Sequence, residues 1–234
     1  MTVVGVAALA VIALFVPKDN QDSTERGSLR DELKVLARRP VLLGLLTTVL
    51  GYAGVFAVFT YFAPILTGIT GFSEAAVSPI LLVFGGGLVL GNLVGGKLAD
   101  RSLMATLLGT LGLLSVVLAA MTLGIHNKIA AIAFVGLLGA AAFATVPPLQ
   151  MWVLEKADGA GQSLASSLNI AAFNLGNALG AWLGGFVIDH GSGLGAVTWV
   201  AALLPASGLL LALWSRGLDR AEASPVLAPV KSGI

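Results

Sequence analysis

The stretch GLVLGNLVGGKLAD, residues 87–100, recurs in pattern as GNALGAWLGGFVID, residues 176–189. Both stretches read G-x3-G-x3-G-G-x3-D, and two copies of one pattern indicate an internal repeat. The glycines of each copy lie within a long apolar stretch, which is the setting of a membrane-spanning helix.

The composition places most of the chain in lipid. Of the 234 residues, 57% are hydrophobic and 11% are charged, and the mean hydropathy is +0.95, whereas soluble domains carry about 25% charged residues. The net charge of +1 gives no basis for a nucleic-acid partner, and the sequence has no cysteine for a disulfide or a thiolate metal site. Membrane lipids are therefore the first partners that we predict.

Six apolar stretches are long enough to cross a bilayer, which takes about 20 residues. They are Val41–Ala63, Ala76–Gly96, Leu103–Gly124, Ile129–Pro148, Leu164–Ile188 and Leu194–Trp214. A shorter stretch, Val3–Pro17, predicts a truncated span over residues 1–17. We expect a cytoplasmic linker with an amphipathic helix over 18–40, the six-helix bundle over 41–214 and a disordered cytoplasmic tail over 215–234.

The two glycine patterns lie three spans apart, and an odd number of spans reverses the direction of a helix across the bilayer. The predicted fold is an all-α membrane protein whose six full transmembrane helices form two inverted three-helix repeats, preceded by the truncated span. Inverted repeats of this kind are typical of secondary transporters.

Lysine and arginine predict the orientation of the spans. Twelve of the 13 fall in one alternating set of connections, residues 18–40, 97–102, 155–163 and 215–234, while Lys128 lies in the other set. Because positive residues stay on the cytoplasmic side, the linker and the C-terminus are predicted to be cytoplasmic.

Three glycines of each repeat share one helix face at a four-residue spacing: Gly87, Gly91 and Gly95, and Gly176, Gly180 and Gly184. Small residues at this spacing let helix backbones approach closely in lipid, so we predict helix packing for all six. The segment GNLVGGK, residues 91–97, nearly matches a phosphate-binding loop but is followed by leucine rather than serine or threonine. No nucleotide site is therefore predicted.

The segment Gly96-Lys97-Leu98-Ala99-Asp100-Arg101 follows the second full span at a short turn. It resembles the G-x-L-A-D-[RK] loop of the major facilitator superfamily of transporters. Ser102-Leu103-Met104 replace the usual glycine and basic residues, which suits the second half of such a transporter. The resemblance implies that Asp100 and Arg101 form a gating latch, and ordinary flanking charge is the alternative.

The order of the segments is also similar to this superfamily. A truncated span, a linker and six full spans correspond to the sixth to twelfth helices of a twelve-helix member. The resemblance therefore implies a missing N-terminal six-helix half as a partner, and a multi-pass protein of the bacterial inner (plasma) membrane. The segment Asn169–Asn177 resembles the eleventh helix of the proton-antiport branch that contains the drug and sugar efflux proteins, similar to arabinose efflux permeases.

Polar and aromatic residues near the middle of the spans predict the wall of a substrate cavity. The candidates are Tyr52, Phe56, Asn92, Phe173, Asn174 and Asn177. Buried amides need hydrogen-bond partners, and hydrogen bonding between helices explains the asparagines as well as cavity lining does. Pro147 and Pro148 predict a bend or an end of their helix, with Gln150 placed to satisfy a freed carbonyl.

These features predict a secondary active transporter that works by alternating access on a small organic substrate such as a drug, sugar or nucleoside. The family resemblance implies efflux by proton antiport. The alternative is a bundle that binds a ligand or partner, or dimerises with itself, without transporting. No His, Asp, Glu or Cys lies in a predicted span, so we predict no enzyme activity, no metal site and no cofactor.

Overall fold

The computed structural model describes residues 38–157 and 161–223. Six helical segments in this part of the chain are long and apolar enough to cross a membrane: Arg39–Phe59, Glu74–Arg101, Leu103–Gly124, Lys128–Ala157, Gln162–His190 and Leu194–Arg220. The prediction of six full spans is confirmed. The predicted truncated span, the linker up to residue 37 and the tail from residue 224 lie outside the described residues.

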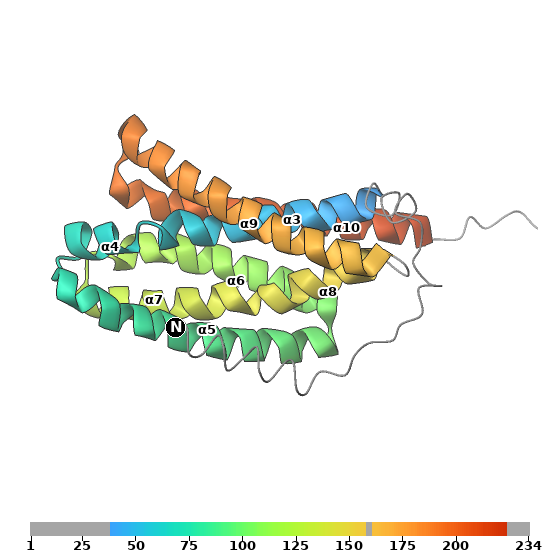
Figure 1. Cartoon of the computed structure of the whole chain (residues 1–234), viewed down its shortest axis with the longest axis horizontal. Helices are drawn as coiled ribbons and strands as arrows, with labels where there is room; N and C mark the ends of the chain where they lie inside the picture. The colour runs from blue at the N-terminus through green and yellow to red at the C-terminus, as the bar shows by residue number, and fades with distance from the viewer. Residues whose placement is uncertain (1–37, 158–160, 224–234) are drawn as a thin grey trace, which may run out of the picture.

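The spans lie side by side along the long axis of the molecule (Figure 1). The first is α3 (Arg39–Phe59), followed by the short α4 (Phe62–Pro64) and the π-helical turn η2 (Ile65–Ile69). The next are α5 (Glu74–Arg101) and α6 (Leu103–Gly124), and the fourth is divided into α7 (Lys128–Ala144) and α8 (Val146–Ala157). The last two are α9 (Gln162–Val187) with the π-helical turn η4 (Ile188–Ser192), and η5 (Leu194–Ala196) with α10 (Val197–Ala223).

The fourth span bends at Thr145 and continues, instead of ending at its two prolines. The Thr145 hydroxyl donates to the Ala142 carbonyl at 2.5 Å, and the Leu149 N–H donates to the Thr145 carbonyl at 3.1 Å. Pro147 and Pro148 lie in the first turn of α8, where backbone N–H groups have no partner within the helix, so the missing donors cost little. The helix therefore runs on to Ala157.

The last helix also extends further than hydropathy predicts. α10 continues to Ala223, so residues 215–223 are helical and the prediction of a disordered tail from residue 215 is wrong for this part. Ser215 is buried, and Asp219 forms an ion pair with Lys156 of α8 at 2.5 Å. These contacts stabilise the polar end of α10, which lies beyond its apolar stretch and therefore is not stabilised by burial in lipid.

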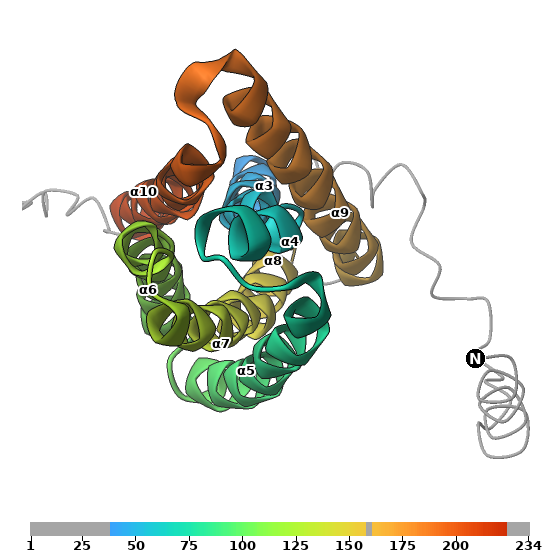
Figure 2. The same cartoon turned by 90° about the vertical axis from the view of Figure 1, so that its left-hand side faces the viewer.

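The two glycine patterns occupy equivalent helix contacts. α5 packs along α7, and α9 packs along α3 (Figure 2). A Cβ on Gly87, Gly91 or Gly95 would lie closer than 3.0 Å to the carbonyl oxygens of Gly136, Ala140 and Ala144. A Cβ on Gly176, Gly180 or Gly184 would lie equally close to those of Val49, Ala53 and Ala57. The second span therefore meets the fourth as the fifth meets the first, which is the relation that an inverted repeat produces.

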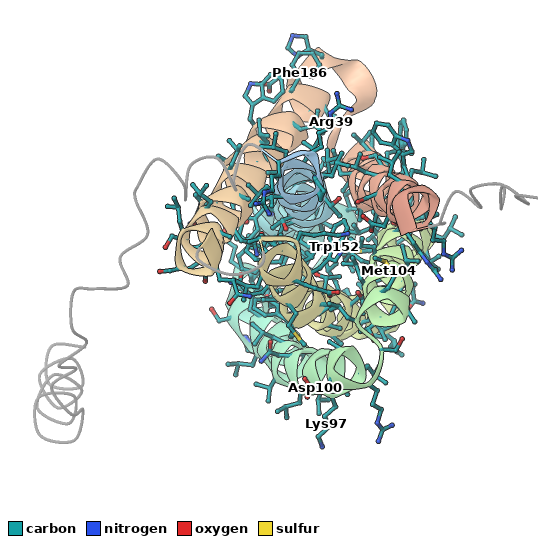
Figure 3. All side chains as sticks on the ribbon, turned by 90° about the vertical axis from the view of Figure 1, so that its right-hand side faces the viewer. Arg39, Lys97, Asp100, Met104, Trp152 and Phe186 are labelled. Atoms are coloured by element: carbon teal, nitrogen blue, oxygen red, sulfur yellow. The ribbon has the colours of Figure 1, made fainter. Side chains whose placement is uncertain are left out.

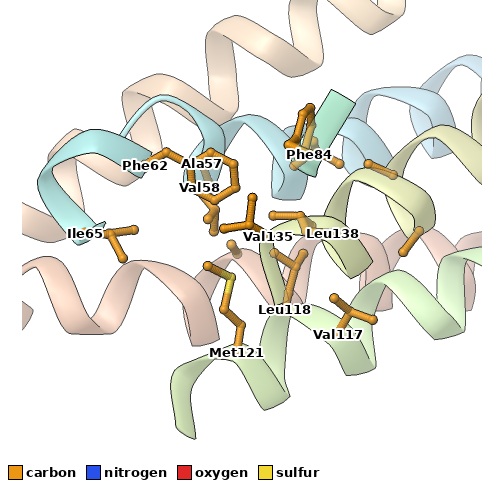
Figure 4. Close-up of a cluster of buried hydrophobic side chains, with 14 of the residues drawn as sticks. Ala57, Val58, Phe62, Ile65, Phe84, Val117, Leu118, Met121, Val135 and Leu138 are labelled. Atoms are coloured by element: carbon orange, nitrogen blue, oxygen red, sulfur yellow. The ribbon is translucent and has the colours of Figure 1, made fainter. Parts of the chain in front are cut away.

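An apolar core lies between these helix pairs. Val58, Phe84, Leu118, Met121 and Leu138 are buried together in it (Figure 4). Lipid tails are as apolar as these side chains, so close packing, rather than exclusion from water, holds the spans together.

Candidate functional site

An aromatic cluster joins four of the spans at the level of the predicted cavity. The Tyr52 ring of α3 lies 4.8 Å from the Phe173 ring of α9, 6.0 Å from Phe56 and 6.3 Å from Phe143 of α7. The Phe143 ring in turn lies 6.4 Å from the ring of Phe84 on α5. Three of the predicted cavity residues, Tyr52, Phe56 and Phe173, are thus brought together.

Sequence reasoning missed part of this cluster. Phe59 comes seven residues after Tyr52 and three residues after Phe56, so the three rings share one helix face. This spacing could have identified Phe59 from the sequence. Its ring lies 5.1 Å from the Phe84 ring. Phe84 and Phe143 come from other helices, and no pattern in the sequence places them beside Tyr52.

The three predicted asparagines have different surroundings. Asn174 is exposed and donates to the Ile170 carbonyl of its own helix at 3.0 Å. The Oδ1 atom of Asn177 is buried and has no hydrogen-bond partner among the described residues. Asn92 is exposed on α5, and no ring contact or hydrogen bond joins it to the aromatic cluster within the described part of the chain.

α9 presents two exposed faces of opposite character. One carries exposed apolar side chains, Leu175, Leu179, Trp182 and Phe186. The other, about 100° around the helix, carries Ser163, Ser167, Asn174 and Ala178 together with the exposed Ile170. The Ser167 hydroxyl and the Asn174 amide donate to carbonyls of their own helix, and small and polar side chains are enriched where helices contact one another in lipid. The first face is therefore suited to lipid, and the second to another protein surface or to water.

A buried polar chain ties α9 to α3 and α8. Thr48 donates to Asn169 Oδ1 at 2.8 Å, Asn169 Nδ2 donates to Gln150 Oε1 at 2.7 Å, and Gln150 Nε2 donates to the Ser166 hydroxyl at 2.8 Å. Asn169 is fully buried. Gln150 therefore bonds to α9, and the prediction that it satisfies a carbonyl freed by the prolines is wrong.

The predicted latch residues lie at the end of α5. Asp100 and Lys97 project outward there (Figure 3). Arg101 is also exposed, and neither Asp100 nor Arg101 forms an ion pair with another described residue. At this end of the bundle, Lys156 and Asp219 form an ion pair that joins α8 to α10.

Six spans in two inverted repeats, with a polar face beside an aromatic cluster, form the architecture of half a membrane transporter. The sequence model described as the Major Facilitator Superfamily matches residues 1–165. The "Inner membrane transport protein YdhP" of Escherichia coli (strain K12) is 43% identical over 211 residues, 90% of this chain and 54% of that protein. The chain belongs to the Major Facilitator Superfamily.

Two further similarities bear on the length and the fold. A "Chloramphenicol resistance protein" of Streptomyces lividans is 34% identical over 184 residues, 79% of this chain and 47% of that protein. The crystal structure of FucP, a transporter of the same superfamily in the outward conformation, matches with a TM-score of 0.71 at 18% identity, over 92% of this chain and 52% of that one. The chain therefore has the fold of one half of such a transporter and spans about half the length of the curated relatives it matches.

Proposed function

We propose that this chain forms one half of a secondary active exporter of a small organic solute. The observation that carries the proposal is the exposed face of α9 with Ser163, Ser167 and Asn174, because Asn174 lies next to the half-buried Phe173 of the aromatic cluster. The half-buried Phe173 ring and the exposed Asn174 amide beside it would suit a solute with aromatic or apolar area and a few hydrogen-bonding groups.

The partner in this proposal is an N-terminal six-helix half. Ser78, Asn92 and Gly96 share one side of α5, as Ser163, Ser167 and Asn174 share one side of α9. Small and polar side chains are what helix contacts in lipid prefer. We infer that this N-terminal half contacts these two sides and that the solute binds between the halves, each end opening in turn.

The coupling ion is proposed to be the proton, carried outside this chain. No Asp, Glu or His lies within the six predicted spans, and intramembrane carboxylates are the usual proton carriers. The titrating carboxylate is therefore assigned to the N-terminal half.

The direct test is to express this chain alone and together with a matched N-terminal half, such as that of the YdhP protein. Cells with both halves should export chloramphenicol and survive a higher concentration of it than cells with either half. The two halves should also purify together in mild detergent. Full export by this chain alone would instead support a self-dimerising transporter, and failure of the halves to purify together would contradict the proposed partner.

Phe173→Ala should lower the export rate about fivefold, because it removes the ring that contacts Tyr52 at 4.8 Å and aromatic pairs contribute about 1 kcal/mol beyond their area. Phe186→Ala is the matched control, since this phenylalanine lies on the lipid-facing side of the same helix. Export is measured as loss of labelled solute from preloaded cells. An equal effect of both variants would show that the cluster has no specific role in binding.

A further inference from the structure

A cavity of about 330 Å³ opens at the surface of the bundle between α3 and α10. It is lined by Arg39, Leu42 and Leu43 of α3 and by Trp214 and Leu218 of α10. It lies at the end where α3 begins and α10 ends, the end predicted to face the cytoplasm (Figure 1). Tyr52 of the aromatic cluster is 13 residues further along α3, or about 20 Å at the helical rise, so this is a separate site.

The lining residues are ordered along the membrane normal. Arg39 lies at the start of α3 and Leu218 near the end of α10, while Leu42, Leu43 and Trp214 lie about one helical turn, or about 5 Å, further into the bilayer. Figure 3 looks onto this end and shows Arg39 at the outside of the bundle. A phospholipid carries its phosphate at the membrane surface and its acyl chains inside. The cavity has the matching order, with a cation at the surface, a tryptophan near the interface and an apolar cleft inside.

The charge at this end favours an anion. Arg39 forms no ion pair with another described residue, and Arg38 beside it is exposed. The carboxylate of α10 closest in sequence to Leu218, Asp219, is bound by Lys156 at 2.5 Å. Among the described residues no carboxylate competes for Arg39, and basic pockets between helices on the cytoplasmic side are where anionic lipid head groups bind.

A second groove on the bundle surface serves as a comparison, because it is lined without a cation. Between α3 and α9, Leu46, Val49, Leu168 and Leu175 line a cavity of about 320 Å³ that has no charged lining residue. That groove can hold an acyl chain of any lipid. The cavity at Arg39 adds a fixed cation at head-group height, and that cation is the basis for selecting one lipid class.

We propose that this cavity binds one anionic phospholipid of the inner leaflet. The guanidinium of Arg39 pairs with the phosphate, and one acyl chain lies along Leu42, Leu43 and Trp214. The binding is independent of transport, because it uses neither the aromatic cluster nor the polar face of α9.

Trp214 reports occupancy of this cavity directly. The sequence has four tryptophans, of which Trp152 is buried, so Trp182→Phe with Trp199→Phe leaves Trp214 as the lipid-exposed one. The chain is reconstituted in vesicles of phosphatidylcholine and phosphatidylglycerol, with one or the other brominated on its acyl chains. At equal mole fraction, brominated phosphatidylglycerol should occupy the site about fivefold more than brominated phosphatidylcholine, as expected for one arginine at a membrane surface.

Three substitutions in that background decide the proposal. Arg39→Gln should abolish the preference for phosphatidylglycerol, and Arg39→Lys should keep most of it. Arg216→Gln should leave it unchanged, since this substitution removes the same charge at the same end of the bundle, but Arg216 points about 160° away from Trp214 around α10. Equal quenching by the two lipids in the parent chain, or a preference that survives Arg39→Gln, would overturn the proposal.

Discussion

Gly180→Leu is expected to prevent stable assembly of the bundle. A Cβ at this position would lie closer than 3.0 Å to the carbonyl oxygen of Ala53 and the amide nitrogen of Ala57. Both are backbone atoms of α3 and cannot move aside by changing rotamer, so α9 must separate from α3. Overpacking costs about 1–3 kcal/mol and occasionally more, and we expect a loss of about 3 kcal/mol here. Thermal denaturation of the purified chain in detergent measures it.

Two further variants make that result specific. Gly91→Leu should be equally destabilising, because the equivalent glycine of the first repeat meets the backbone of Ala140 on α7 in the same way. Gly86→Leu should have little effect, since Gly86 is exposed on α5 and its Cβ would have no neighbour within 4 Å. Unchanged melting of the Gly180 and Gly91 variants would contradict the close-contact account of both helix pairs.

Asn169→Leu is expected to cost about 1 kcal/mol of stability. It leaves the Gln150 amide oxygen without the donor that Asn169 provides at 2.7 Å, while the Thr48 hydroxyl, which bonds to Asn169 at 2.8 Å, keeps its bond to the Gly44 carbonyl at 3.2 Å. Unpaired buried polar groups cost about 1–3 kcal/mol each, although lipid-embedded hydrogen bonds measure at the low end of that range. Denaturation in detergent should show a lower midpoint for this variant.

Asn174→Leu makes the matched comparison. It is the same substitution on the same helix, but Asn174 is exposed and bonds to its own backbone at 3.0 Å. Its stability should be close to that of the parent chain, while export by the two-half transporter should fall because the residue lies on the proposed solute face. If Asn174→Leu destabilises as much as Asn169→Leu, the distinction between a buried polar link and an exposed binding face is wrong.

Hydropathy located the six spans because lipid requires a minimum apolar length, but it located their ends less well. It placed the end of the fourth span at Pro148, nine residues before Ala157, and the start of the tail at residue 215 within α10. A helix that leaves the bilayer no longer needs apolar residues. Its end is then set by contacts such as Lys156–Asp219, which join residues far apart in the sequence.

The candidate site was predictable in its α3 and α9 parts only. Tyr52, Phe56, Phe173, Asn174 and Asn177 share helix faces that follow from the 3.6-residue period. The partners of those faces do not follow from it: Phe143 comes from α7, and the buried Asn169 bonds across 121 residues to Thr48.

The sequence by itself determined that the chain lies in lipid, crosses it six times and carries a repeated glycine face in two spans of opposite direction. These properties depend on composition, length and periodicity, which are local. Only the tertiary structure decided that each glycine face meets the first helix of the other repeat, and that Arg39 and Trp214 border one cavity. Many helix pairings satisfy the same apolar patterns, and the shapes of the meeting surfaces select among them.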